Sequence, residues 1–367
     1  MNEILAAHLT PSQIIMDIMV LFMLAGAVDY VCGNKLGLGH QFAEGFGAFG
    51  SIAITMTGVL VLVPLISNHL GPVISPLFEA IGVDPAMFAG AVLACDMGGW
   101  PLAGELANSP EAAGLGGMIL SSMMGVNVVF NIPVALGILD KKDFPAMSRG
   151  MLYGFITIPL GCLAGGLAAG YALPSLLRNL IPVIVFSVVI ALMLRFLPEI
   201  TTKIFLIFGK VIGIAATLAA AVAIASQLTG ITVIPGLGSV LDAMDVLVSI
   251  ILVLPGAYVM VNVVSRLLKK PFSKIGRLLG INDKSTLGLI ATLANAVPTF
   301  GLVKDMDERG KIVNFAFLTG AAFVLGDHLA FCSAMDQTLV LPMIAAKLTA
   351  GITAVLLALW MTRQEKA

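Results

Sequence analysis

Nine runs of about 20 apolar residues set the limits on what this chain can fold into. They lie at about 12–32, 44–66, 115–139, 148–172, 175–197, 205–228, 245–267, 311–331 and 338–361. A helix needs about 20 residues to cross the hydrocarbon core of a bilayer. Because 59% of all residues are hydrophobic and only 11% are charged, little of the chain remains for a soluble domain. The sequence therefore predicts an all-α polytopic membrane protein.

Two further apolar stretches are interrupted by residues that break helices. The first contains Asp96 followed by Gly98 and Gly99, and the second contains Asn295 followed by Pro298. Within a membrane, the backbone groups freed by such a break must be satisfied by protein or by a water-filled cavity. The two breaks therefore mark the predicted solute site.

The two interruptions belong to an internal repeat. Gly82 aligns with Gly280 and Gly90 with Gly288, both at an offset of 198 residues (280 − 82 and 288 − 90). This register predicts two units of five elements joined by a linking helix. The predicted boundaries are 1–172 for the first unit with a broken helix at about 85–104, 173–204 for the linking helix, and 205–367 for the second unit with a broken helix at about 285–304.

The charges of the loops predict how the repeats are oriented. Lys and Arg gather near 35 and at 141–149, 195–210, 266–277 and 363–366, whereas 67–84, 105–114 and 229–244 contain neither. The positive-inside rule places the basic loops in the cytoplasm. All loops agree only if both broken segments are re-entrant hairpins, and the repeat is then inverted, with the N-terminus outside and the C-terminus in the cytoplasm.

Several classes of function are excluded or disfavoured. A net charge of −1 without basic clusters gives no basis for binding nucleic acid. The four cysteines have no paired spacing, so neither a disulfide framework nor a metal site is indicated. Catalytic and nucleotide-binding signatures are missing from the sequence, which predicts no enzyme activity and no cofactor. Glycines at 161, 165, 166 and 170 indicate close helix packing or a contact between subunits, so a homo-oligomer stays open.

Asp96 is the leading candidate for binding a solute, because ionisable groups inside a membrane usually face a cavity or a partner. Together with Trp100 it offers a carboxylate beside an aromatic face, which suits a small organic cation. The alternative is that Asp96 caps the second half of the broken helix by accepting backbone N–H groups.

Three asparagines, one aspartate and one histidine complete the predicted site. Asn295, the counterpart of Asp96, would suit a hydroxyl group or would serve only as a structural residue at the break. The remaining candidates are Asn127, Asn131, Asp327 and His328. An Asp-His pair within a span is either a functional pair or satisfies itself, and a histidine there would make uptake depend on pH.

Three further ionisable residues receive other roles. Asp29 lies near a helix end and is predicted to be structural, and Glu44 is predicted to lie at an interface or in a vestibule rather than to be a central ligand. Lys347 either pairs with an acid or extends its ammonium group to the membrane surface, and the sequence favours the second.

Long motifs in this order resemble the EutH family of bacterial ethanolamine permeases over nearly the whole chain. They are Gln41–Phe46, Met87–Gly99, Phe130–Gly137, Ala291–Asn295 and Ala322–Leu329. The resemblance implies transport of ethanolamine across the bacterial inner membrane, as a facilitator, and a protonated amine would match Asp96. The alternative is a proton- or sodium-coupled symporter of another small amine or amino acid.

Overall fold

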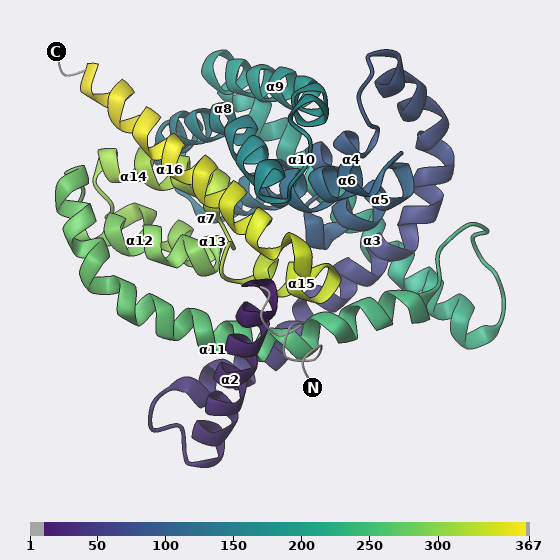
Figure 1. Ribbon diagram of the computed structural model, residues 1–367, viewed down its shortest axis with the longest axis horizontal. Helices are drawn as coiled ribbons and strands as arrows, with labels where there is room; N and C mark the ends of the chain where they lie inside the picture. The colour runs from purple at the N-terminus through teal and green to yellow at the C-terminus, as the bar shows by residue number, and fades with distance from the viewer. Residues whose placement is uncertain (1–10, 365–367) are drawn as a thin grey trace.

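Long apolar helices form the body of the protein, in a computed structural model that describes residues 11–364 (Figure 1). They are α2 Pro11–Val31, α3 Leu38–Ala80, α8 Phe144–Ala168, α9 Leu173–Phe196, α10 Pro198–Thr229, α11 Val240–Leu279 and α16 Val340–Gln364. With the composite helix Pro110–Ile138 they give eight segments long and apolar enough to cross a bilayer, within the described part of the chain. The prediction of an all-α polytopic membrane protein is confirmed.

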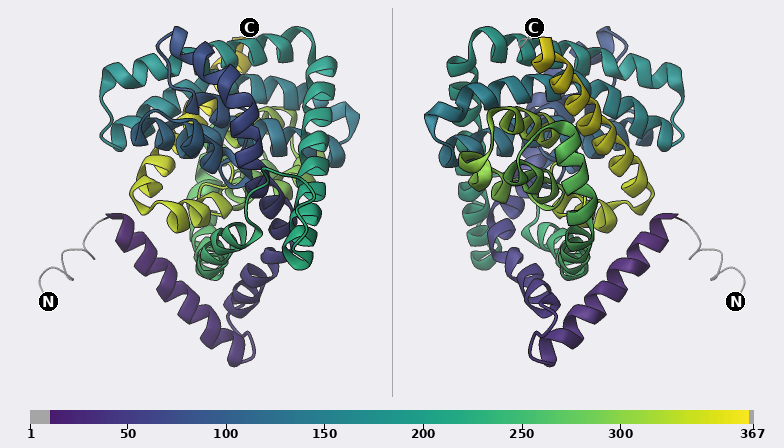
Figure 2. Two further views of the ribbon diagram at one scale, coloured as in Figure 1. Left: turned by 90° about the vertical axis from the view of Figure 1, so that its right-hand side faces the viewer. Right: turned by 90° about the vertical axis from the view of Figure 1, so that its left-hand side faces the viewer.

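Helix α2 and the first turns of α3 form an arm that stands away from the rest of the body (Figure 2). The arm is held at its tip by Asp29, whose carboxylate accepts hydrogen bonds from the N–H groups of Leu36, Leu38 and Gly39 at 2.8–2.9 Å. These bonds satisfy backbone N–H groups at the start of α3 that have no hydrogen-bond partner within the helix. The predicted structural role of Asp29 is confirmed.

The composite helix consists of α6 Pro110–Ala113, two wide π-helical stretches at Gly114–Gly125 and Asn127–Asn131, and α7 Ile132–Ile138. Its glycines allow unusually close contact with a neighbouring backbone. A Cβ atom on Gly116 would lie 2.4 Å from the carbonyl oxygen of Ala86, and one on Gly125 would lie 1.9 Å from that of Leu93. The composite helix therefore fixes the position of the first break.

The predicted eighth run, at 311–331, does not form one continuous helix. Helix α14 Glu308–Ala321 ends there, residues 322–326 are unwound, and α15 Asp327–Met335 follows. Phe323 has φ of +64°. Its N–H donates to Thr292 O at 3.0 Å and that of Leu325 donates to Leu293 O at 2.9 Å. The helix breaks because these two donors satisfy carbonyl groups at the end of another helix, which have no partner of their own.

Both predicted breaks fold back as helical hairpins. Hairpin 1 consists of α4 Ala86–Val92, a 3-10 turn at Cys95–Met97 and α5 Gly99–Leu106, and hairpin 2 consists of α12 Asp283–Ala294 and α13 Ala296–Leu302. In hairpin 2, Thr299 Oγ1 donates to Gly288 O at 3.0 Å, eleven residues back along the chain. A continuous helix would separate these atoms by about 16 Å, so α13 folds back on α12.

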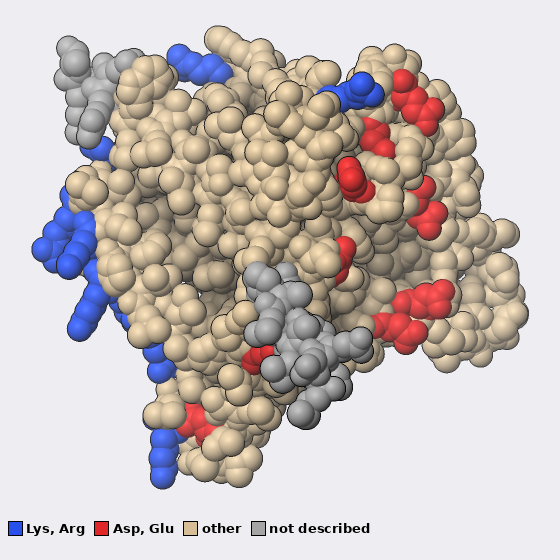
Figure 3. Space-filling model, in the orientation of Figure 1, with Lys and Arg blue, Asp and Glu red and all other residues tan. Residues whose placement is uncertain are grey.

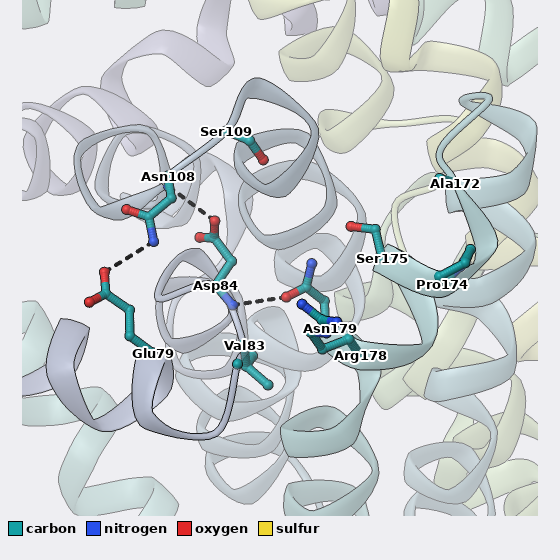
Figure 4. Close-up of a pocket in the computed structure, with 11 residues that line it drawn as sticks. Glu79, Val83, Asp84, Asn108, Ser109, Ala172, Pro174, Ser175, Arg178 and Asn179 are labelled. Carbon is teal, nitrogen blue, oxygen red and sulfur yellow. Dashed lines mark hydrogen bonds between the residues drawn. The ribbon is translucent and has the colours of Figure 1, made fainter.

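A hydrogen bond closes the open end of each hairpin. In hairpin 1 the N–H of Asn108 donates to Asp84 Oδ2 at 3.0 Å, and the Asn108 side chain also donates to Glu79 (Figure 4). In hairpin 2 the N–H of Asn282 donates to Asp307 Oδ1 at 2.8 Å. The two ends of each hairpin therefore lie side by side, and Asp84 and Asn282 are again 198 positions apart (282 − 84).

The two hairpins approach the centre from opposite ends of the molecule, with α4 and α5 at the right and α12 and α13 at the left of Figure 1. On the face shown in Figure 3, Lys and Arg gather at the left, where α11 ends, and Asp and Glu gather at the right. This is the charge separation on which the predicted orientation depends. The inverted relation between the two units stays a prediction.

Candidate functional site

A small cavity lies at the tip of hairpin 1. Its volume is about 190 Å³, and the ionisable and aromatic side chains that line it are those of Asp96, Phe130, Phe323, Asp327 and His328. We call it the inner cavity. Pockets for drug-sized ligands have volumes of about 300–1,000 Å³, so this one matches a smaller solute.

Asp96 faces the inner cavity without capping a helix. The N-cap position of α5 is occupied by Gly98, in a left-handed conformation with φ of 93°, and no side chain caps that helix. Atom Oδ1 of Asp96 is buried and has no hydrogen-bond partner among the described residues. His328 Nε2 lies 3.8 Å from this oxygen. Asp96 thus presents a carboxylate oxygen whose bonding capacity is unused, and the capping alternative is wrong.

Behind His328 lies a lysine that the sequence placed elsewhere. Lys347 is completely buried. Its ammonium nitrogen lies 3.1 Å from His328 Nδ1 and donates to the carbonyl oxygen of Ser122. The prediction that Lys347 reaches the membrane surface is wrong, because α16 places it midway along a helix that packs against α8 and the composite helix.

Cys95 joins this group. Its Sγ, a carboxylate oxygen of Asp96 and a ring nitrogen of His328 all lie within 4.8 Å of one another. Thiolate, carboxylate and imidazole are ligands that zinc accepts. Sequence spacing could not indicate this set, because Cys95 lies in hairpin 1 and His328 lies in α15, far from it along the chain. The neighbouring ammonium group of Lys347 opposes a metal cation here.

The aromatic side chains of the inner cavity are phenylalanines. Phe130 and Phe323 pack edge to face with ring centroids 5.7 Å apart, and Phe323 lies 5.1 Å from the His328 ring. Trp100 packs instead among apolar side chains around Met118. The structure therefore does not bring Trp100 to the lining beside Asp96. Phe323 could not be singled out from sequence, because its position depends on the unwound 322–326 segment.

A second cavity adjoins the first. This vestibule has a volume of about 370 Å³ and is lined by Gln41, Glu44, Tyr258, Asn295 and Asp327, among others. Glu44 lines this cavity and does not line the inner cavity. Asp327 lines both cavities and accepts a hydrogen bond from the Tyr258 hydroxyl at 3.3 Å.

Asn295 belongs to the vestibule and not to the inner cavity. Its Oδ1 accepts a hydrogen bond from Val297 N–H at 2.9 Å, so it caps α13. Asp96 and Asn295 therefore do not face each other across one site, and Asp327 is the side chain that connects their cavities. The structural alternative for Asn295 is the one that the geometry shows.

Asn127 and Asn131 lie in the packed interior. The Asn127 amide donates to Met123 O at 2.5 Å and to Thr319 O at 2.7 Å, and Asn131 donates to Asn127 Oδ1 at 2.9 Å. The inner cavity is lined by the adjacent Val126 and Phe130. The two asparagines thus connect the composite helix to α14 beneath the lining.

Eight helical segments of the described residues are long and apolar enough to cross a bilayer, and together with the two helical hairpins they define a multi-pass membrane protein. The chain belongs to the EutH family, whose profile, described as "Ethanolamine utilisation protein, EutH", matches residues 12–361.

Relatives share the full length of the chain. A protein of Listeria monocytogenes named "Probable ethanolamine permease EutH" is 47% identical over 96% of this chain and 95% of its own. A protein of Escherichia coli with the same name is 43% identical over 97% of both chains. The "Uncharacterized protein YxeR" of Bacillus subtilis is 40% identical over 98% of this chain and 97% of its own. No solved structure matches the chain.

Proposed function

We propose that this protein carries ethanolamine, in its ammonium form, across the bacterial inner membrane by facilitated diffusion. Support comes from the family and from relatives named probable ethanolamine permease at 43–47% identity. The resemblance of the sequence motifs led to the same substrate. The site residues are proposed from geometry and chemistry.

The observation that carries the proposal is the buried Asp96 Oδ1, which has no hydrogen-bond partner among the described residues and faces a cavity of about 190 Å³. An ammonium group supplies both a positive charge and N–H donors to such an oxygen. The rings of Phe130 and Phe323 add aromatic faces, which attract cations. A small aminoalcohol satisfies the carboxylate, the rings and the volume together.

The route follows from the shared side chain. A cation in the vestibule meets Glu44 and Asp327, and a cation in the inner cavity meets Asp327 and Asp96. Asp327 can therefore remain a partner of the solute during its passage. We place this route between the two hairpins of an inverted repeat, with the N-terminus outside and the C-terminus in the cytoplasm.

The test is uptake of labelled ethanolamine into liposomes that contain the purified protein, without an imposed ion gradient. We expect uptake by the wild type and at least a tenfold loss in Asp96→Asn, which keeps the shape and removes the charge. Asp242→Asn, at the exposed start of α11, is the matched control and keeps full uptake.

Two results would contradict the proposal. Unchanged uptake by Asp96→Asn removes that carboxylate from the site. Uptake that begins only when a proton or sodium gradient is applied replaces facilitated diffusion with the coupled symporter.

A further inference from the structure

Among the described residues, Lys347 is the only lysine or arginine that contacts a side chain lining the inner cavity. It is completely buried, donates to the carbonyl oxygen of Ser122 and lies 3.1 Å from His328 Nδ1. A buried charge in a membrane protein is costly and is kept where it has a partner or a function. Its contacts come from the composite helix and α15, so it is held from two sides.

The contact with Lys347 determines how His328 is protonated. An ammonium group donates hydrogen bonds and cannot accept them, so Nδ1 of His328 must be the acceptor. The ring proton then lies on Nε2, which faces Asp96 Oδ1 at 3.8 Å. His328 is consequently an uncharged ring between a cation and an anion.

Two carboxylates and one ammonium group set the charge around the inner cavity. Asp96 and Asp327 line it and contribute −2, His328 contributes none, and Lys347 behind His328 contributes +1. The sum is −1 when the carboxylates and the ammonium group are ionised. One monovalent cation brings this group to neutrality, whereas a dication leaves an excess positive charge.

We infer that Lys347 is a specificity-determining residue, whose charge behind His328 makes the inner cavity select monovalent ammonium solutes and reject dications. The inference rests on the proposed function and adds its charge selectivity. Rejection by a fixed like charge is a repulsive element of the kind that specific sites use against competitors. A unit charge at about 8 Å in a medium of dielectric constant about 20 changes affinity on the order of tenfold.

The test compares two probes that differ in charge and little in size. At neutral pH ethanolamine carries one charge, and 1,3-diaminopropane carries two. Binding is measured as the shift in melting temperature of the detergent-purified protein at increasing probe concentration, since a ligand that binds the folded state raises that temperature. This readout needs no transport.

Two single variants change the charge count, and the double variant restores it. Lys347→Met takes it to −2, and we expect the affinity for 1,3-diaminopropane relative to ethanolamine to rise on the order of tenfold. Lys347→Met with Asp327→Asn returns the count to −1 and restores the wild-type ratio. Asp327→Asn alone takes the count to zero and lowers the ratio below that of the wild type.

A folded Lys347→Met protein with the wild-type ratio would overturn the inference. If that variant does not fold, Asp327→Asn decides the matter alone, because an unchanged ratio there also overturns it. Failure of the proposed function looks different, since wild-type protein would then neither bind ethanolamine nor carry it into liposomes.

Discussion

Lys311 Nζ lies 2.8 Å from Asp143 Oδ1, and this buried ion pair joins α14 to the turn that precedes α8. Asp143 and Lys311 come from the two predicted repeat units. The Asp143 side chain is 2% exposed and the Lys311 side chain 9%, so the pair is shielded from water. Lys311 also contacts Glu308, whose side chain is 78% exposed.

Lys311→Met is therefore expected to lower the stability of the folded protein by about 3–5 kcal/mol, because it leaves a buried carboxylate uncompensated. Combining it with Asp143→Asn is expected to recover most of that loss. Glu308→Gln is the control and changes stability by about 1 kcal/mol or less, since water screens its charge. Melting temperatures in detergent measure all three, and a double variant no more stable than Lys311→Met contradicts the assignment.

Asp307→Ala is expected to loosen hairpin 2. Its carboxylate accepts hydrogen bonds from Asn282 N–H, from Ser285 Oγ at 2.8 Å and from Gly310 N–H at 3.1 Å. Losing them leaves donors without partners and costs about 2–3 kcal/mol. The exposed Asp305→Ala is a matched control, because the Asn282 side chain bonds to its backbone carbonyl, which the substitution keeps. Equal melting temperatures for the two variants would refute the role of this carboxylate.

Gly326→Ala is expected to reduce ethanolamine uptake at least tenfold. A Cβ atom at this position would lie 1.9 Å from Ala294 O, so the unwound segment would have to move and carry Asp327 with it. Gly301→Ala in α13 has open space around the added carbon and favours helix by about 1 kcal/mol. We expect it to keep uptake and folding. Wild-type uptake by Gly326→Ala would show that the approach of these two backbones is not required.

Asn127→Ala is expected to destabilise the protein more than Asn131→Ala, by about 1–3 kcal/mol. Asn127 bonds to carbonyl groups of two different segments, Met123 and Thr319, whereas Asn131 donates to Asn127. Thermal unfolding of the two purified variants tests the order. The reverse order would place the structural role on Asn131.

Both hairpins could be located from the sequence because their breaks contain residues that interrupt helices. These are Gly98 and Gly99 in one hairpin, and Asn295 and Pro298 in the other. The third break was missed because Ala322 to Leu325 are apolar and only the carbonyl groups of Thr292 and Leu293 cause the chain to unwind there. Such partners come from distant segments and cannot be found in a local pattern.

The site was predicted in part for the same reason. Asp96, Asp327 and His328 were identifiable as ionisable groups in apolar surroundings, and the structure places them around one cavity. Lys347 and Phe323 were not, because their roles depend on which neighbours the packing brings to them. The position of a residue along a helix can be deduced from the sequence, whereas the side chains that it faces depend on the tertiary fold.

Asp327 borders both cavities, and this shared carboxylate limits how many solutes can bind at once. Two solutes, one in each chamber, would compete for the same carboxylate, so simultaneous occupancy carries an electrostatic penalty. The protein should therefore hold one cation at a time. We expect flux to saturate hyperbolically with concentration, and solute on the far side to slow entry from the near side.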